Sequence, residues 1–300
     1  MNTKRENPLR RAVHRVTIVT ACMVVAVAQG QPAFWAQTGG PEGASMIGFA
    51  RLPDGEILAS AKSSGVFRSL DSGTTWQLAN GNIANDYGEG AIWMGPIVAD
   101  DDGYAYLFHW GVFRGEKLGG LWHWEYLRDN MDDPENRRPL APSGGAVMSR
   151  ENTPDRVFVA AWTWSWTEIG GTVWLPCVSY TDDHGDTWKN VLLPDSDPAE
   201  PALGVTVSPE GCVWAVTTHK IYKSTDAGQT WAEAHDASEF VGYPYDSEPR
   251  QVSFAGAIAA SPAGDIYVAL YGGDGTLRID PDGTAVELPT YHAGVYFFTS

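Results

Sequence analysis

The fold is decided by the stretch Ser69-Leu70-Asp71-Ser72-Gly73-Thr74-Thr75-Trp76, because the same phrase returns twice further along the chain. The copies are Thr181–Trp188 and Ser224–Trp231, and all three have the pattern Ser/Thr-x-Asp-x-Gly-x-Thr-Trp. Short apolar runs precede and follow each copy, which is typical of the tight turn of a β-hairpin. In such a turn the Asp carboxylate accepts backbone N–H groups, Gly takes a positive φ, and Thr-Trp begins the return strand.

The phrase resembles the Asp-box, or BNR repeat, of the sialidase-like β-propellers at all three sites. This resemblance implies an all-β fold in which the boxes are structural and lie at the outer rim of the blades, away from the ligand face. The residues that it marks as structural are Asp71, Gly73 and Trp76, Asp183, Gly185 and Trp188, and Asp226, Gly228 and Trp231.

A second repeat sets the length of the structural unit. A strand, a turn and another strand recur around Gly55, Gly103, Asp155, Gly211 and Gly264, at spacings of 48, 52, 56 and 53 residues. This period is close to that of propeller blades. We therefore predict a β-propeller of four-stranded antiparallel blades, with about five blades readable. In blade 2 Lys117 stands where the phrase has Asp, and in blade 5 Asp280–Gly283 is a generic hairpin turn.

The two ends of the chain suggest a larger ring. Phe34–Gly40 resembles Thr75–Gly81, the last strand of blade 1, so we expect it to supply an outer strand to the final blade. Gly294–Ser300 stops while a strand pattern is still in progress. We interpret residues 29–300 as an Asp-box propeller that is incomplete at its C-terminus, a truncated form of a six- to eight-bladed ring.

Residues 1–28 have the pattern of a secretory signal peptide. A cationic lead is followed by the apolar run Val16–Ala28 and by Ala26-Val27-Ala28, an A-x-A cleavage pattern. The apolar run has 13 residues, whereas a membrane-spanning helix needs about 20, so no stable membrane span is expected. We predict a secreted, periplasmic or cell-surface protein. Val19–Cys22 resembles a lipoprotein signal, which makes lipid anchoring the alternative.

The charge of the chain excludes some classes of partner. The formal net charge is −17, and removal of residues 1–28 takes away five basic residues and one acidic residue, which leaves −21. This charge repels nucleic acid and anionic lipid, so no nucleic-acid partner is expected. Neither Cys177 nor Cys212 lies at metal-ligand spacing, so they form one disulfide or remain two buried thiols. No metal site and no cofactor are predicted.

The lengths of the connections distinguish two faces of such a propeller. The turns between strands 1 and 2 and between strands 3 and 4 share one face and are short, and we call this the turn face. The 2–3 turns and the crossings between blades share the other, the long-loop face, where binding residues are expected. Its expected long segments are Asn80–Gly95, Glu125–Ser143, Ala161–Val173, Leu193–Leu203 and Ala234–Phe254.

Aromatic and charged residues in these segments suit a sugar, because rings stack on its C–H faces and charged groups bond to its hydroxyls. The predicted ligand-binding residues are Trp93, Trp164, Trp166, Tyr243, Tyr245 and Arg250. The alternation of Trp162, Trp164 and Trp166 is also typical of packing along one face of a strand. The candidate catalytic acids are Glu168 and Asp246, a pair of the kind that hydrolyses glycosidic bonds.

Three functions remain open at this point. The first is an exported propeller that binds a glycan or protein through its long-loop face without chemistry. The second is a sialidase-like glycoside hydrolase, although the resemblance implies a Phe/Tyr-Arg-Ile-Pro phrase that only Ala50–Pro53 approaches, at a turn on the other face. The third is an assembly or scaffold factor similar to the photosystem assembly propellers. The repeat architecture is the only support for this function.

Overall fold

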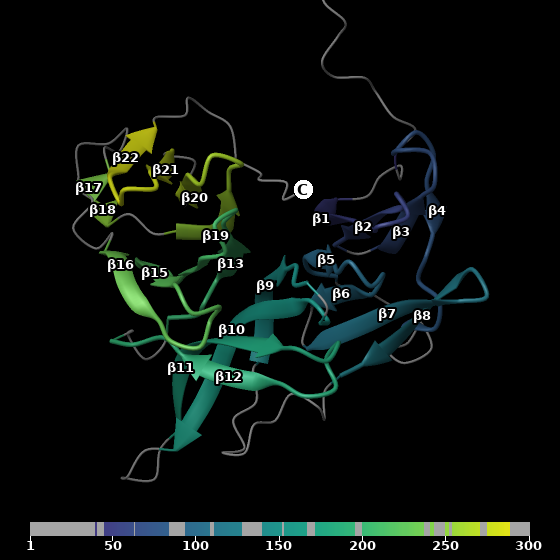
Figure 1. The fold of residues 1–300 in the computed structure, drawn as a ribbon, viewed down its shortest axis with the longest axis horizontal. Coiled ribbons are helices and arrows are strands. Elements are labelled where there is room, and N and C mark those ends of the chain that lie inside the picture. Colours follow the sequence, from purple (N-terminus) through teal and green to yellow (C-terminus); the bar gives the residue numbers. More distant parts are fainter. Residues whose placement is uncertain are drawn as a thin grey trace, which may run out of the picture. The chain divides into compact units, whose positions relative to one another are not determined.

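The described part of the protein is made of antiparallel strands, and each strand pairs with strands next to it in the sequence (Figure 1). The computed structural model describes residues 40, 45–62, 64–83, 94–108, 111–127, 140–151, 153–166, 172–195, 200–236, 241–242, 250–251, 254–270 and 275–288. All of them belong to the unit that runs from residue 39 to residue 300. Among them, no helix is long and apolar enough to cross a membrane.

The described residues form five four-stranded antiparallel sheets, and we call them blades 1 to 5 in chain order. Blade 1 contains β1 (Met46–Arg51), β2 (Ile57–Ala61), β3 (Gly65–Ser69) and β4 (Gln77–Leu78); blade 2 contains β5 (Ile97–Ala99), β6 (Ala105–Phe108), β7 (Val112–Leu118) and β8 (Leu121–Tyr126). Blade 3 contains β9 (Leu140–Met148), β10 (Arg156–Trp166), β11 (Thr172–Thr181) and β12 (Lys189–Leu192); blade 4 contains β13 (Gly204–Val207), β14 (Val213–Val216), β15 (Lys220–Ser224) and β16 (Ala232–Asp236). Blade 5 contains β19 (Phe254–Ala260), β20 (Ile266–Leu270), β21 (Thr276–Ile279) and β22 (Ala285–Leu288), and a short ribbon of β17 (Val241–Gly242) and β18 (Arg250–Gln251) precedes it.

The first strands of successive blades lie side by side. β1 contacts β5, β5 contacts β9, β9 contacts β13, and β13 contacts β19. Strands follow one another outward in each blade, from the first to the fourth. The protein is a β-propeller with five blades among the described residues, which confirms the predicted fold class.

The core lies between neighbouring blades because successive side chains of a strand point to opposite faces of its sheet. Along β10, Val157 and Val159 pack on Tyr106 of blade 2, whereas Phe158 packs on Tyr222 of blade 4. All five of these side chains are fully or almost fully buried. A sheet that is apolar on both faces needs a neighbour on each side, and stacked blades provide one.

Hydrogen bonds between residues of the same eight-residue repeat hold each of these turns together. Asp71 Oδ1 accepts the backbone N–H of Thr75 at 2.7 Å, and Asp71 Oδ2 accepts the Thr75 hydroxyl at 2.7 Å. The Ser69 hydroxyl oxygen accepts the Gly73 N–H at 2.8 Å. The same bonds recur in Thr181–Trp188 and Ser224–Trp231. The fourth residue of each turn has a left-handed φ of 56–57°, at Ser72, His184 and Ala227.

Blade 2 replaces the turn carboxylate with an ion pair to its neighbour. The Lys117 ammonium contacts Asp54 and lies 2.8 Å from Oε2 of Glu56, both in blade 1. The other oxygen of Glu56 accepts the indole N–H of Trp122 at 2.8 Å. At the position of Lys117, blade 2 therefore has an ion pair to blade 1, whereas the repeated phrases have an Asp that accepts hydrogen bonds within its own turn.

The structure decides two predictions, one about a long loop in blade 3 and one about the two cysteines. Ala161–Val173 was expected as a long loop, but β10 continues to Trp166 and β11 begins at Thr172, so most of it is strand. Neither Cys177 nor Cys212 is in a disulfide, which excludes the bond between them. Cys177 is buried between blades 2 and 3, whereas Cys212 is half-buried between blades 4 and 5.

Candidate functional site

A protruding hairpin marks the long-loop face of blade 3. β10 and β11 have 11 and 10 residues, whereas the middle strands of the other blades have four to seven (Figure 1). β9 pairs with β10 as far as Trp162, and β12 pairs with β11 only from Cys177 onward. Beyond these points β10 and β11 pair with each other alone and form a two-stranded hairpin.

Two tryptophans lie together on this hairpin. Trp162 faces Pro176 in the register, and Trp174 lies two residues from Pro176 on the same side of the sheet. Their ring centroids are 5.9 Å apart with 45° between the planes, and Trp174 is 40% exposed. Such cross-strand aromatic pairs stabilise a hairpin that has only two strands. The exposed indole also gives the face a flat apolar surface.

A carboxylate and an imidazole meet on the same face in blade 4. Glu200 precedes β13, and His219 lies in the turn between β14 and β15, so the topology places both on the long-loop side. His219 Nδ1 contacts Glu200 Oε1, and the two side chains are 23% and 16% exposed. A carboxylate at Nδ1 orients the ring and leaves Nε2 for a ligand or a proton.

The structure describes only some of the residues predicted to form the site. Trp93, Glu168, Tyr243, Tyr245 and Asp246 lie outside the described residues. For three others the backbone alone is described, with Trp164 and Trp166 in β10 and Arg250 in β18. Trp164 faces Trp174 in the register, which ties this predicted residue to the aromatic hairpin.

Sequence reasoning missed Trp174 and the pair of Glu200 and His219. Trp174 directly follows the expected loop Ala161–Val173, and it would have been found by extending the alternation of β10 across the hairpin. Glu200 and His219 are 19 residues apart in the chain. No local pattern joins a crossing segment to a turn, so their contact had no sequence signal.

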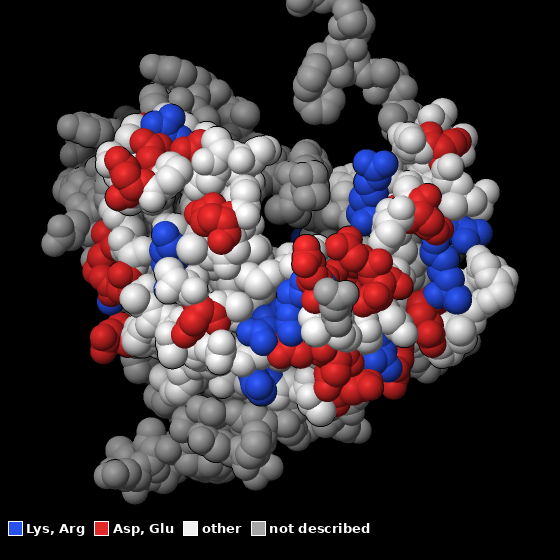
Figure 2. Space-filling model, viewed as in Figure 1, with Lys and Arg blue, Asp and Glu red and all other residues white. Residues whose placement is uncertain are grey.

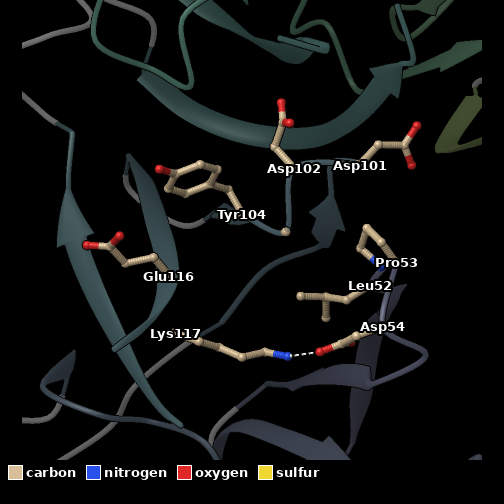
Figure 3. Close-up of a pocket in the computed structure, with 9 residues that line it drawn as sticks. Leu52, Pro53, Asp54, Asp101, Asp102, Tyr104, Glu116 and Lys117 are labelled. Atoms are coloured by element: carbon tan, nitrogen blue, oxygen red, sulfur yellow. Dashed lines mark hydrogen bonds and ion pairs between the residues drawn. The ribbon is translucent and has the colours of Figure 1, made fainter. Parts of the chain in front are cut away.

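The turn face, predicted to carry no site, contains two acid-lined hollows on either side of the Asp100–Gly103 turn. The first, of about 400 Å³, lies between blades 1 and 2, and the second, of about 550 Å³, lies between blades 2 and 3. Asp101 and Asp102 line both. Figure 3 shows these two carboxylates across the first hollow from the pair of Lys117 and Asp54. Figure 2 shows acidic side chains gathered over β5 and β6, with basic side chains beside them.

A buried carboxyl group organises the second hollow. The Asp100 side chain is fully shielded from solvent, and it accepts the Tyr104 N–H at 2.8 Å and the Tyr106 hydroxyl at 3.0 Å. Burial raises the pKa of Asp100 despite these bonds. Burial and the neighbouring Asp100 likewise raise the pKa of Tyr106 far above its usual range. His184 Nδ1 lies 3.3 Å from Asp100, and Nε2 lies 3.6 Å from Asp102.

Other acids of the turn face are engaged in bonds within blade 3 and between blades 2 and 3. Asp155 accepts the N–H groups of Asp101 and Arg150, and Asp182 pairs with Arg150 and Arg156. Within the described part of the chain, no three His, Cys, Asp or Glu side chains are grouped so that they could hold a metal ion. The hollows are therefore best explained as joints between blades.

A smaller hollow of about 170 Å³ lies between the first strands of blades 1 to 4. Apolar residues supply most of its lining, and Arg51 adds a guanidinium group. Arg51 ends β1 beside the turn at Pro53, on the side expected from the sequence, and its side chain is exposed. It has no charged partner among the described residues.

No protein family matches this chain, and no curated protein sequence matches it either. Virginiamycin B lyase from Staphylococcus aureus is 13% identical over 84% of this chain and 86% of its own, with a TM-score of 0.46. YCF48 from Cyanidioschyzon merolae is 14% identical over 85% of this chain and 88% of its own, with a TM-score of 0.47. The GH74 xyloglucanase from Xanthomonas campestris is 17% identical over 75% of this chain and 35% of its own, with a TM-score of 0.49.

Identities of 13–17% say nothing about activity or ligand. The five blades themselves define the fold, and any function resides in the residues of this chain.

Proposed function

We propose that this protein is an exported Asp-box β-propeller that binds a glycan or a glycan-bearing protein through its long-loop face. The observation that carries the proposal is the exposed indole of Trp174 beside Trp162, on a hairpin that extends beyond its four-stranded blade. Sugar rings stack on flat aromatic surfaces of this kind. A rigid sheet that presents such residues on a protruding hairpin is a common arrangement for binding.

Two further features support the proposal. The three eight-residue turns share one set of hydrogen bonds, which favours the Asp-box, sialidase-like group of propellers as the relatives of this chain. The sequence of residues 1–28 favours export, and hence a secreted, periplasmic or cell-surface location where glycans are met. Polar groups for sugar hydroxyls are available on the same face in Glu200 and His219.

The test is a glycan array followed by titration of the best ligand. Trp174→Ala should weaken binding by about 1–3 kcal/mol, the range for loss of an aromatic contact at a binding surface. The matched control is Leu118→Ala, because Leu118 is 54% exposed at a hairpin tip on the turn face. Loss of binding in the control, or unchanged binding in Trp174→Ala, would place the ligand elsewhere.

Binding and hydrolysis are separated by a reducing-sugar assay on the same ligand. A binding module releases no reducing ends, whereas a hydrolase does, and in a hydrolase Glu168→Gln should abolish that release. Glu168 and Asp246, the candidate acids of the hydrolase, both lie outside the described residues.

A further inference from the structure

Four carboxylates gather between blades 3 and 4 on the long-loop side. They come from the turn after β12, the crossing before β13 and the strand β16, and they are Asp195, Glu200, Glu233 and Asp236. His219 Nδ1 contacts the Glu200 carboxylate. The Lys220 ammonium lies 2.6 Å from Oε2 of Glu233 and 3.1 Å from the carbonyl oxygen of Asp195, so it ties the two blades together. We call these six residues the acidic junction.

The acidic junction carries a negative charge. Its four carboxylates face one ammonium group, that of Lys220, and one imidazole that is charged only when it is protonated. The chain as a whole has a formal net charge of −17. An anion that approaches the junction is therefore repelled and a cation is attracted, most strongly at low ionic strength.

A buried hydroxyl group faces the acidic junction. Tyr222 pairs with Glu233 in the register of β15 and β16, so both side chains lie on the same face of blade 4. Tyr222 is fully buried, and no described residue bonds to its hydroxyl. Burial raises the pKa of Tyr222, and the charges of the four carboxylates raise it further. A buried hydroxyl without a partner costs free energy, which a ligand can recover by supplying the missing bond.

The acidic junction adjoins the aromatic hairpin of blade 3. Tyr222 belongs to one buried cluster with Ala160 of β10 and Ala202 of the crossing. Trp162 follows Ala160 on the same face of β10, because side chains alternate along a strand, and Trp174 lies beside it. The crossing that carries Ala202 supplies a carboxylate of the junction two residues earlier. The tryptophans and the carboxylates therefore border the same part of the long-loop face.

We propose that the acidic junction selects glycans that carry a free amino group and rejects glycans that carry carboxylate or sulfate groups. The ligand is the glycan of the proposed function, on which this inference rests. Its ring stacks on Trp174, and its ammonium group donates to the carboxylates and to the hydroxyl oxygen of Tyr222. Because this hydroxyl is shielded in the free protein, the ammonium group reaches it by displacing the long side chain of Lys220, which is 23% exposed.

Three forms of one short glucosamine oligosaccharide test the selection, because they share a backbone and differ in charge. The amino groups are free in the first form, acetylated in the second and sulfated in the third. Calorimetric titrations are made at low ionic strength and at a pH at which the free amino groups are protonated. The amino form should bind about tenfold more tightly than the acetylated form, and the sulfated form more weakly than both. Added salt should shrink these differences.

A matched pair of variants locates the effect. Glu233→Gln removes one carboxylate of the acidic junction and should lower the preference for the amino form about threefold or more. Glu210→Gln is the control, because Glu210 is exposed in the β13–β14 turn on the turn face of the same blade. It changes the net charge equally and should leave the preference unchanged. Equal effects of the two variants overturn the proposal, because the attraction is then that of the whole acidic protein.

Tyr222→Phe separates a role in binding from a role in folding. The hydroxyl bonds to no described residue, so the variant should keep the melting temperature of the wild-type protein. It should bind the amino form about two- to tenfold more weakly, the range for one hydrogen bond. Unchanged binding of the amino form overturns the proposal. A fall in the melting temperature overturns it as well, because the hydroxyl then already has a partner in the folded protein.

Failure of this inference can be distinguished from failure of the proposed function. If no glycan on the array binds, the proposed function fails and the charge selection fails with it. If glycans bind through Trp174 but the amino form is not preferred, or does not bind, the charge selection alone is overturned. The same conclusion follows if the glycans that bind best carry carboxylate or sulfate groups.

Discussion

Lys117 Nζ lies 2.8 Å from Oε2 of Glu56, and it joins β7 of blade 2 to a side chain that is only 3% exposed in blade 1. This contact is made by the residue at which the repeated phrase departs from its pattern. The turn has lost its own carboxylate, and the blades have gained a bond between them.

We expect Lys117→Asp to destabilise the fold although it restores the repeated phrase. It removes the counter-charge of a buried carboxylate and places a second carboxylate beside it. Lys117→Met should raise the free energy of the folded state by about 2–4 kcal/mol, because Glu56 is left buried and unpaired. Lys117→Asp should cost more than Lys117→Met in urea unfolding.

The control for this prediction is the double variant Glu56→Gln/Lys117→Met, which removes both charges. The double variant leaves no buried charge without a partner. Its loss of stability should therefore be smaller than the sum of the losses in Glu56→Gln and Lys117→Met. A Lys117→Asp protein as stable as wild type would show that the contact does not contribute.

The carboxylate of Asp226 should stabilise its turn by a modest amount. Asp226→Ala removes the acceptor of the Thr230 N–H and of the Thr230 hydroxyl. The turn is exposed to solvent, so we expect a loss of about 1–2 kcal/mol in urea unfolding, at the low end for bonds to a charged group. Thr225→Ala is the control, since Thr225 is exposed in the same turn and makes no described bond. Equal losses in both variants would contradict the role of the carboxylate.

The same turn predicts a dependence of stability on acid. The Thr230 hydroxyl, the Thr230 N–H and the Ser224 hydroxyl lower the pKa of Asp226 from 3.8 to about 2. Hydrogen bonds from Thr75 also lower the pKa of Asp71, and bonds from Thr187 lower that of Asp183 against the effect of its partial burial. A lowered folded pKa gives stability that is complete above the unfolded pKa and is lost as the pH falls through the folded value.

The melting temperature should therefore fall as the pH drops from about 4 to about 2, the window between the unfolded and folded pKa values. Asp226→Asn should show a smaller fall, because its amide does not titrate. A variant whose melting temperature follows that of wild type over this range would exclude Asp226 as a source of the dependence.

The sequence predicted the blades because the turn phrase is local, and its bonds join residues two and four positions apart. The junctions between blades were beyond its reach. Arg114 and Asp186 are 72 residues apart, and Arg156 and Ala227 are 71 residues apart. Such contacts depend on how one blade stacks on the next. The candidate site was predicted in part for the same reason: the alternating tryptophans are a local pattern, whereas the contact of Glu200 with His219 is not.

The last prediction tests the packing between blades 2 and 3 at Gly145 in β9. A Cβ atom at Gly145 would lie 2.2 Å from the Phe108 ring and 2.9 Å from the carbonyl oxygen of Phe158. Phe108 is fully buried, so its ring has little space into which to move. Gly145→Ala should therefore destabilise the protein by about 1–3 kcal/mol in urea unfolding, the usual range for overpacking.

The neighbouring glycine gives a close control. A methyl group at Gly144 would have the Cα of Gly204 as its nearest atom, at 3.4 Å, which is an ordinary contact, so Gly144→Ala should be nearly neutral. Gly145→Ala combined with Phe108→Leu should recover part of the loss, because the smaller side chain vacates the space that the new methyl group needs. If Gly144→Ala proves the more damaging change, β9 presents its other face to blade 2, and the alternation on which the stacking of the blades is argued is wrong.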